Sequence, residues 1–281
     1  MQHSESSFKG ADNLSLYAQQ WLPDGSPRAT VAIAHGIGEH SGRYMNIVES
    51  MVSNQCAIYS YDHRGHGKSP GQRGHINSWT EYRTDLLNFL KSIRSQQPDS
   101  PLFLMGHSMG ALIVLDFILS EDEGMADGLA GIILSGAPIE PVGVASSFLI
   151  ALARVLSRIY PRFSVDLGLD LNAISRDPAV IETYKHDPLV HAKVSVRWGT
   201  ESLAAVESVK RQAENIHLPI LMLHGEADSL NSAEGAKNYF NRIPVQDKEF
   251  IAYPSGYHEP HNDLDHEKMV TDLLHWVSKH L

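Results

Sequence analysis

A serine flanked by two glycines, in the segment Gly106 to Gly110, is the most chemically informative feature of this sequence. The pattern Gly-x-Ser-x-Gly places a serine hydroxyl on a tight turn when a short apolar strand precedes it and an apolar helix follows. Both neighbours are present, because 102–105 predicts a buried strand and 109–120 a largely apolar helix. We therefore predict a nucleophilic Ser108 on a strained turn; the alternative is an ordinary glycine-rich turn.

A serine hydroxyl becomes a good nucleophile only when a base takes its proton and a third group orients that base. In parallel-sheet hydrolases built on this turn, the serine, the acid and the histidine follow one another in that order along the chain. Asp228 follows the predicted strand 219–223, and His258 follows the predicted strand 248–253. These positions predict that Asp228 and His258 converge on Ser108, with Glu226 and His261 as the alternative acid and base.

Attack on a carbonyl creates an oxyanion that needs hydrogen-bond donors already in place. The backbone N–H after the nucleophile and one from an earlier loop usually supply them. Met109 provides the first, and the loop that leaves the predicted strand 30–34 provides the second, for which we select Ile37. We predict that these two amides form the substrate-binding oxyanion hole.

Strand-like and helix-like segments alternate through most of the chain. Short apolar runs predict strands at 8–9, 14–21, 30–34, 56–61, 102–105, 131–135, 219–223 and 248–253. Amphipathic or apolar runs predict helices at 43–53, 79–95, 109–120, 233–241 and 266–280. Such alternation is typical of an α/β protein with a mostly parallel sheet of about eight strands flanked by helices. The turn-rich spacer 10–13 predicts an antiparallel hairpin at one edge.

The alternation stops between 138 and 215, a stretch too long for a simple crossover. We expect a helical cap there, inserted between two parts of one core, 1–137 and 216–281. The segment 142–162 is largely apolar, contains Arg154, Arg158 and Arg162, and has no acidic residue. Two interpretations stay open: a lid helix with its arginines in water, or an amphipathic helix that contacts a lipid surface.

Composition excludes several classes of protein. The 281 residues carry a net charge of −10, with 23 basic and 33 acidic residues, which argues against a nucleic-acid partner. The first residues show no secretory signal, and no apolar run reaches the roughly 18 residues that cross a bilayer. The one cysteine, Cys56, lies in an apolar run and fits a reducing compartment. We expect a cytoplasmic protein, with peripheral membrane contact through the cap as an open possibility.

Four motifs together resemble the monoglyceride lipase and lysophospholipase branch of the α/β-hydrolases. They are the runs 35–44, 62–69, 106–110 and 224–228, and the likeness extends to the cap run 184–189, Tyr-Lys-His-Asp-Pro-Leu. The resemblance implies an α/β-hydrolase fold and a serine esterase without a cofactor, acting on one acyl chain attached to a small polar alcohol. It also implies that Tyr184 faces the alcohol. Ile37 is larger than the residue common at that position in the lipases, which predicts a narrower pocket beside the ester.

Other activities remain compatible with the same residues. A general carboxylesterase, a thioesterase, a serine aminopeptidase or a cofactor-free perhydrolase uses the same triad, and a binding protein can retain it without turnover. A peptidase needs a carboxylate for the free amine of its substrate, and no dedicated one is evident in the sequence. The oligomeric state is open.

Three other groups of polar or glycine residues near these motifs can be interpreted either as structural or as functional. Glu39 and Arg43 are four residues apart, and we consider a polar brace that they form with His261, against separate solvent-facing roles. The glycine-rich run 64–69 lacks the ending of a phosphate-binding loop and predicts a structural turn under the site. His258, His261 and Asp263 lack the spacing of a convincing metal site, so we expect no metal.

Overall fold

The structure is a computed structural model that describes residues 1–120, 126, 128–143 and 146–281. In this part of the chain, an eight-stranded sheet forms the centre of the molecule, in the order β1-β2-β4-β3-β5-β6-β9-β10. From β4 to β10 all neighbours are parallel, whereas β1, β2 and β4 pair antiparallel. The strands are β1 (Gln2–Lys9), β2 (Ser15–Leu22), β3 (Ala29–Ala34), β4 (Cys56–Tyr61), β5 (Leu102–His107), β6 (Leu129–Ser135), β9 (Ile220–Gly225) and β10 (Lys248–Tyr253).

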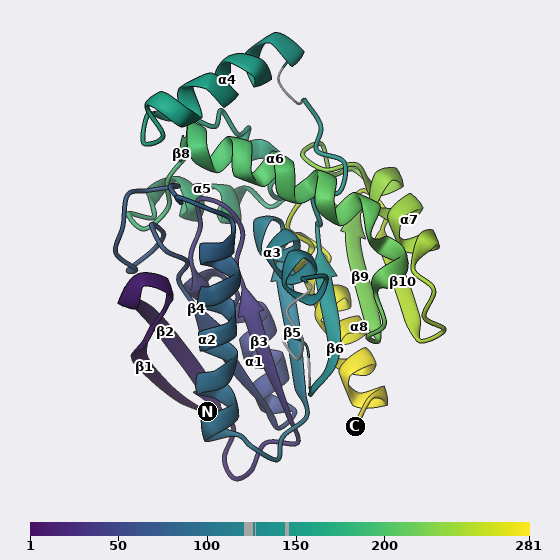
Figure 1. Ribbon diagram of the computed structural model, residues 1–281. Coiled ribbons are helices and arrows are strands. Elements are labelled where there is room, and N and C mark those ends of the chain that lie inside the picture. The colour runs from purple at the N-terminus through teal and green to yellow at the C-terminus, as the bar shows by residue number, and fades with distance from the viewer. Residues whose placement is uncertain (121–125, 127, 144–145) are drawn as a thin grey trace.

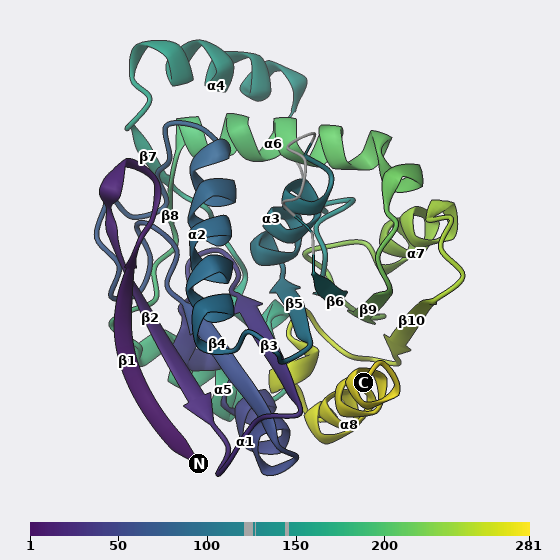
Figure 2. The same cartoon turned by 60° about the horizontal axis from the view of Figure 1, so that its bottom comes forward.

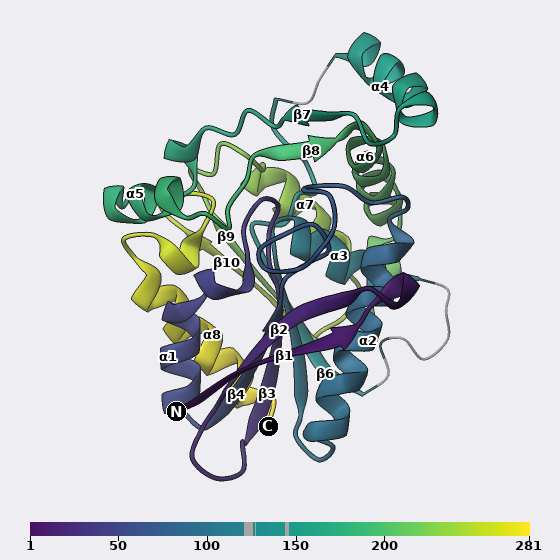
Figure 3. The ribbon, with the colours of Figure 1, turned by 90° about the vertical axis from the view of Figure 1, so that its left-hand side faces the viewer.

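Helices cover both faces of this sheet and make three layers. One group, α1 (Met45–Ser53) and α8 (His266–Lys279), packs on one face, and α2 (Thr80–Gln96), α3 (Met109–Ile118) and α7 (Ala233–Arg242) belong to the cluster on the other face. Figure 3 shows α1 and α8 on the opposite side of the strands from α2 and α3. The predicted α/β-hydrolase architecture is therefore confirmed.

The central strands have continuous apolar sequences and are buried on both faces. Every residue of β3, β4, β5 and β9 is buried, as expected for parallel strands between two helical layers. The edge strand β1 differs from the predicted strand 8–9, since it begins at Gln2. All of its polar residues are exposed and gave no hydrophobic signal. Its pairing with β2 forms the predicted edge hairpin.

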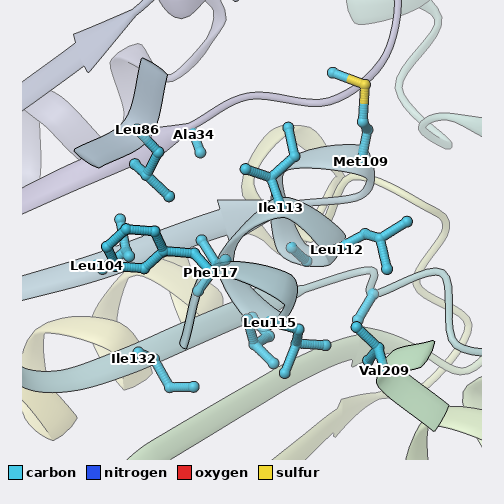
Figure 4. Packing of buried hydrophobic residues seen from close by; sticks show 14 of the residues in the cluster. Ala34, Leu86, Leu104, Met109, Leu112, Ile113, Leu115, Phe117, Ile132 and Val209 are labelled. Atoms are coloured by element: carbon cyan, nitrogen blue, oxygen red, sulfur yellow. The ribbon is translucent and has the colours of Figure 1, made fainter. Parts of the chain in front are cut away.

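Helix α3 is apolar on nearly all sides because it is enclosed. Its side chains contact the sheet, α2 and α6 (Val196–Arg211), and Figure 4 shows Leu112, Ile113, Leu115 and Phe117 within this cluster. The helix ends at Ile118 rather than at the predicted residue 120. Close packing on every side gives the turn before α3 a rigid support.

The segment between β6 and β9 lies over one end of the sheet. It contains α4 (Ser147–Ile159), α5 (Pro178–His186) and α6, together with a small antiparallel hairpin of β7 (Ser164–Asp166) and β8 (Lys193–Ser195). Figures 1 and 2 show α6 crossing above α2 and α3, with α4 as the outermost helix. The hairpin was not predicted, because three-residue strands leave no recognisable periodicity. Residues 144 and 145 of the predicted helix 142–162 lie outside the described residues.

Candidate active site

The turn that carries Ser108 is strained, and both flanking glycines are sterically required. Ser108 has φ 51° and ψ −120°, a backbone conformation with positive φ that side-chain-bearing residues rarely adopt. A Cβ on Gly106 would overlap the backbone of Gly110, and one on Gly110 would overlap the carbonyl of Ala34. The Ser108 N–H donates to the Ser135 carbonyl at 2.9 Å, which fixes the turn to β6. The positive φ of Ser108 agrees with the strained backbone that the sequence predicts for this turn.

Ser108, His258 and Asp228 form one hydrogen-bonded chain. The Ser108 hydroxyl lies 2.9 Å from Nε2 of His258, and Nδ1 of His258 lies 2.8 Å from Oδ2 of Asp228. With Asp228 ionised, Nδ1–H donates to the carboxylate, so Nε2 accepts from the serine. The alternative acid Glu226 is exposed, and the alternative base His261 contacts the ring of His107 rather than Ser108. The chain-order argument therefore selected the residues that the fold brings together.

Asp228 is held in place as an anion by its own loop. Its Oδ1 accepts from the backbone N–H groups of Leu230 and Asn231 at 2.8 and 3.0 Å, and Nε2 of His224 lies 3.3 Å from Oδ2. Burial alone would raise the pKa of Asp228, but His258 and His224 outweigh burial and hold that pKa below its usual range. His224 was not among the predicted site residues, although it lies four residues before Asp228.

His258 is poised as a base by this anion. Burial disfavours the imidazolium, but the charge of Asp228 and its hydrogen bond outweigh that effect and raise the pKa of His258 above its usual value. Among the described residues, neither ring nitrogen of the neighbouring His261 has a hydrogen-bond partner, and burial lowers the pKa of His261 to about 4. Next to the base, His261 is therefore a neutral ring.

The loop that carries His258 is bound along its length by residues 173–176 of the inserted segment. The N–H groups of His258 and Glu259 donate to the carbonyls of Ala173 and Ile174 at 3.3 and 2.8 Å. The Asp263 carboxylate accepts from the backbone N–H and the Nε of Arg176 at 2.8 and 3.0 Å. The segment between β6 and β9 therefore holds the backbone of the histidine loop in place.

Glu39 and Arg43 form a buried network, but their third partner is not the predicted His261. Arg43 Nη1 lies 2.8 Å from Glu39, and Arg43 makes two hydrogen bonds of 2.6 and 2.8 Å to Glu259. His261 instead stacks on Tyr44, with ring centroids 4.8 Å apart. The His261 side chain is buried and its ring is neutral. Arg43 therefore forms its second ion pair with the carboxylate of Glu259, the residue after His258. The predicted solvent-facing alternative is wrong, since the Arg43 side chain is 9% exposed.

This network also reaches the loop after β3. Glu39 Oε1 accepts from the Gly36 N–H at 2.6 Å and from the Tyr44 hydroxyl at 2.7 Å. Arg43 lies over the ring of Tyr184, 4.5 Å from its centroid. Burial raises the pKa of Glu39, whereas Arg43 overcomes burial and holds the pKa of Glu259 below its usual range.

The run 64–69 serves as a structural turn. Arg64 binds the Asp85 carboxylate through two hydrogen bonds of 2.6 and 2.7 Å, which anchors the turn to α2. Asp62, just before it, accepts from the N–H and hydroxyl of Ser41 at 2.8 and 2.6 Å. A Cβ on Gly67 would overlap the Asp62 carboxylate. These contacts fix the turn beneath the loop that contains Ile37 and Glu39.

A cavity of about 450 Å³ opens beside Ser108 and His258. Its walls come from the ends of β3, β5 and β6, from α3, and from the inserted segment including α4 and α6, and they are mostly apolar. Ile37 and Met109 both line it. A cavity of this size and character is suited to a small apolar ligand with few polar anchors.

The described residues contain neither a cluster of metal ligands nor a helix that could span a membrane. No group of three or more histidine, cysteine, aspartate or glutamate side chains there is arranged to hold a metal ion. No helix within 1–120, 128–143 and 146–281 is both long and apolar enough to pass through a bilayer.

The family model for serine aminopeptidase, S33 hydrolases matches residues 25–265. The chain belongs to this family. It is 32% identical over 279 residues to a monoacylglycerol lipase of Mycolicibacterium smegmatis, covering 99% of this chain and 98% of the relative. It is 33% identical to the monoglyceride lipase of Rattus norvegicus, over 95% of this chain and 88% of the relative.

A solved structure has a similar fold. The monoacylglycerol lipase of Paleococcus ferrophilus superposes with a TM-score of 0.82 at 32% identity, covering 100% of both chains. This S33 chain is therefore a serine hydrolase of the monoacylglycerol lipase type, as the sequence motifs predicted.

Proposed function

We propose that Ser108, His258 and Asp228 are the catalytic triad of an esterase that cleaves monoacylglycerols. The single observation that carries this proposal is the chain of hydrogen bonds of 2.9 and 2.8 Å from hydroxyl to imidazole to carboxylate. Nε2 of His258 takes the Ser108 proton as Oγ attacks the ester carbonyl, and then returns that proton to the leaving alcohol. Water, deprotonated by the same imidazole, releases the fatty acid and regenerates the serine.

The amides of Ile37 and Met109 are proposed to bind the oxyanion. Within the described residues, neither N–H donates a hydrogen bond to the protein, so both are available for a ligand. Met109 is the first residue of α3, where the helix dipole favours negative charge. The Gly36 N–H is already bound by Glu39, which holds the loop before Ile37 in place. Each such donor contributes about 3 kcal/mol to lowering the barrier.

The cavity supports an uncharged lipid ester better than a peptide amine. Glu39 and Glu259 are the acidic side chains among the described lining residues, and Arg43 pairs with both. A serine aminopeptidase needs an unpaired carboxylate for the substrate ammonium, so this arrangement argues against that activity. Tyr184, which also lines the cavity, is proposed to face the alcohol.

The insertion, for which we propose the limits 138–215, is also proposed to contact the surface of a membrane or lipid particle. Phe148, Leu152, Val155 and Ile159 form one stripe of α4, and each is at least 45% exposed. Arg154 and Arg158 are exposed on the same helix. Exposed apolar side chains next to cations are typical of helices that lie in a lipid interface.

Replacement of the nucleophile tests the proposed reaction. We expect Ser108→Ala to keep its melting temperature and to lose at least about a thousandfold in kcat toward monoacylglycerols, since the acyl-enzyme cannot form. Wild-type rates should be compared for monoacylglycerols, lysophospholipids, diacylglycerols, thioesters and aminoacyl amides at equal concentration. A Ser108→Ala protein with wild-type turnover, or a wild type that prefers amides, would refute the proposal.

A further inference from the structure

Helix α6 presents a row of residues to the cavity that begins at a glycine. Gly199, Ser202, Leu203 and Val206 all line the cavity, and their spacing of three, four and seven residues places them on one helical face. This row extends for about 10 Å along the helix axis at 1.5 Å per residue. Leu112 of α3 belongs to the same cavity, so the space continues from the helix that follows Ser108 to the row on α6.

Gly199 differs from the structurally required glycines of this chain. A Cβ built at Gly199 meets no atom within 4 Å, whereas one at Gly106, Gly110 or Gly225 would overlap backbone. Its backbone is not in the positive-φ region either, so no turn or close approach requires a glycine here. A glycine inside a helix also lowers helix stability relative to alanine. Gly199 therefore lines the cavity and has open space where a side chain would begin.

We propose that Gly199 determines acyl-chain length, because its missing side chain leaves room for the distal part of a medium or long acyl group. This inference rests on the proposed esterase function and adds the specificity of the acyl subsite. Trp79 and Trp198 belong to the same lining. A side chain added at position 199 occupies part of the cavity and shortens the acyl chain that fits.

The test is a graded series, Gly199→Ala, Gly199→Val and Gly199→Leu, assayed with p-nitrophenyl butanoate, octanoate and hexadecanoate. We expect the ratio of kcat/KM for hexadecanoate to that for butanoate to fall with side-chain size, by at least about tenfold in Gly199→Leu. The matched control is Ala204→Leu, which enlarges an exposed residue of the same helix that does not line the cavity. Its ratio should equal that of the wild type.

Melting temperatures separate a blocked cavity from a damaged fold. Gly199→Ala should melt no lower than the wild type, because alanine favours the helix and meets no atom. If Gly199→Leu unfolds, the alanine and valine variants still measure the trend. An unchanged ratio in folded variants, or equal losses for all three esters, would overturn the proposal. Because aryl esters carry no glycerol, failure of the monoacylglycerol assignment would appear as lost activity on glycerol esters with the chain-length trend intact.

Discussion

Arg43 is the residue at which three separate parts of the site meet. Its guanidinium pairs with Glu39 of the loop after β3, with Glu259 beside His258, and with the ring of Tyr184 from the insertion. Removal of the Arg43 guanidinium would leave the buried carboxylates of Glu39 and Glu259 without the positive charge that compensates them. The side chain therefore connects the loop after β3 to the loop that carries His258.

Arg43→Met should therefore affect both stability and catalysis. Loss of one partner from a buried ion pair costs about 3–5 kcal/mol, so we expect a lower melting temperature and a kcat/KM reduced by at least tenfold. The acidic limb of the pH–rate profile should move to higher pH, since Glu259 and Glu39 favour protonated His258. Arg43→Lys should restore part of the rate. The control is Lys68→Met, which breaks an exposed pair with Glu5; equal effects of the two variants would exclude a positioning role.

At the scale of elements, residues 173–176, between β6 and β9, hold the loop that carries His258. This segment accepts two backbone hydrogen bonds from His258 and Glu259, and Arg176 ties it to the buried Asp263. Asp263 also accepts from the Tyr257 N–H at 2.8 Å, just before the base. The orientation of the imidazole therefore depends on a segment that lies outside the sheet core.

Arg176 allows a matched experiment, because its guanidinium contacts two carboxylates that differ in burial. Nε binds Asp263, which is 2% exposed, and Nη2 binds Asp265, whose side chain is 58% exposed. We expect Arg176→Ala to lower kcat by about threefold to tenfold with little change in KM, and to slow fluorophosphonate labelling of Ser108. Asp265→Asn, which removes only the exposed contact, should stay within twofold of the wild type. Identical rates for Arg176→Ala and the wild type would contradict this role.

At the scale of the whole molecule, charge and apolar surface are distributed unequally. The protein carries a net charge of −10, yet α4, at the end farthest from the sheet, exposes apolar residues and arginines. Ile150 of the same helix lines the cavity beside Ser108. Helix α4 therefore contributes both to the cavity and to the exposed apolar surface. A lipid surface that binds α4 would lie next to the insertion rather than next to the acidic remainder.

Vesicle sedimentation tests this orientation. We expect the wild type to bind phosphatidylcholine vesicles and the double variant Phe148→Ser, Ile159→Ser to bind at least fivefold more weakly, because two exposed apolar side chains are lost. Leu264→Ser removes an apolar side chain that is 58% exposed outside the insertion and should bind like the wild type. Equal binding by all three proteins, or none by the wild type, would rule out docking through α4.

The sequence alone determined how the core strands and helices follow one another along the chain. It also determined Ser108, Asp228 and His258, which the structure joins by hydrogen bonds. Periodicity and the glycine spacing around Ser108 are local properties, and chain order restricts where the acid and the base follow. The tertiary structure decided which side chains surround these three. The partner of Arg43 is Glu259 rather than His261, and His224, Arg176 and Asp263 support the acid and base loops. Such contacts join segments up to 216 residues apart and depend on burial, which no local pattern records.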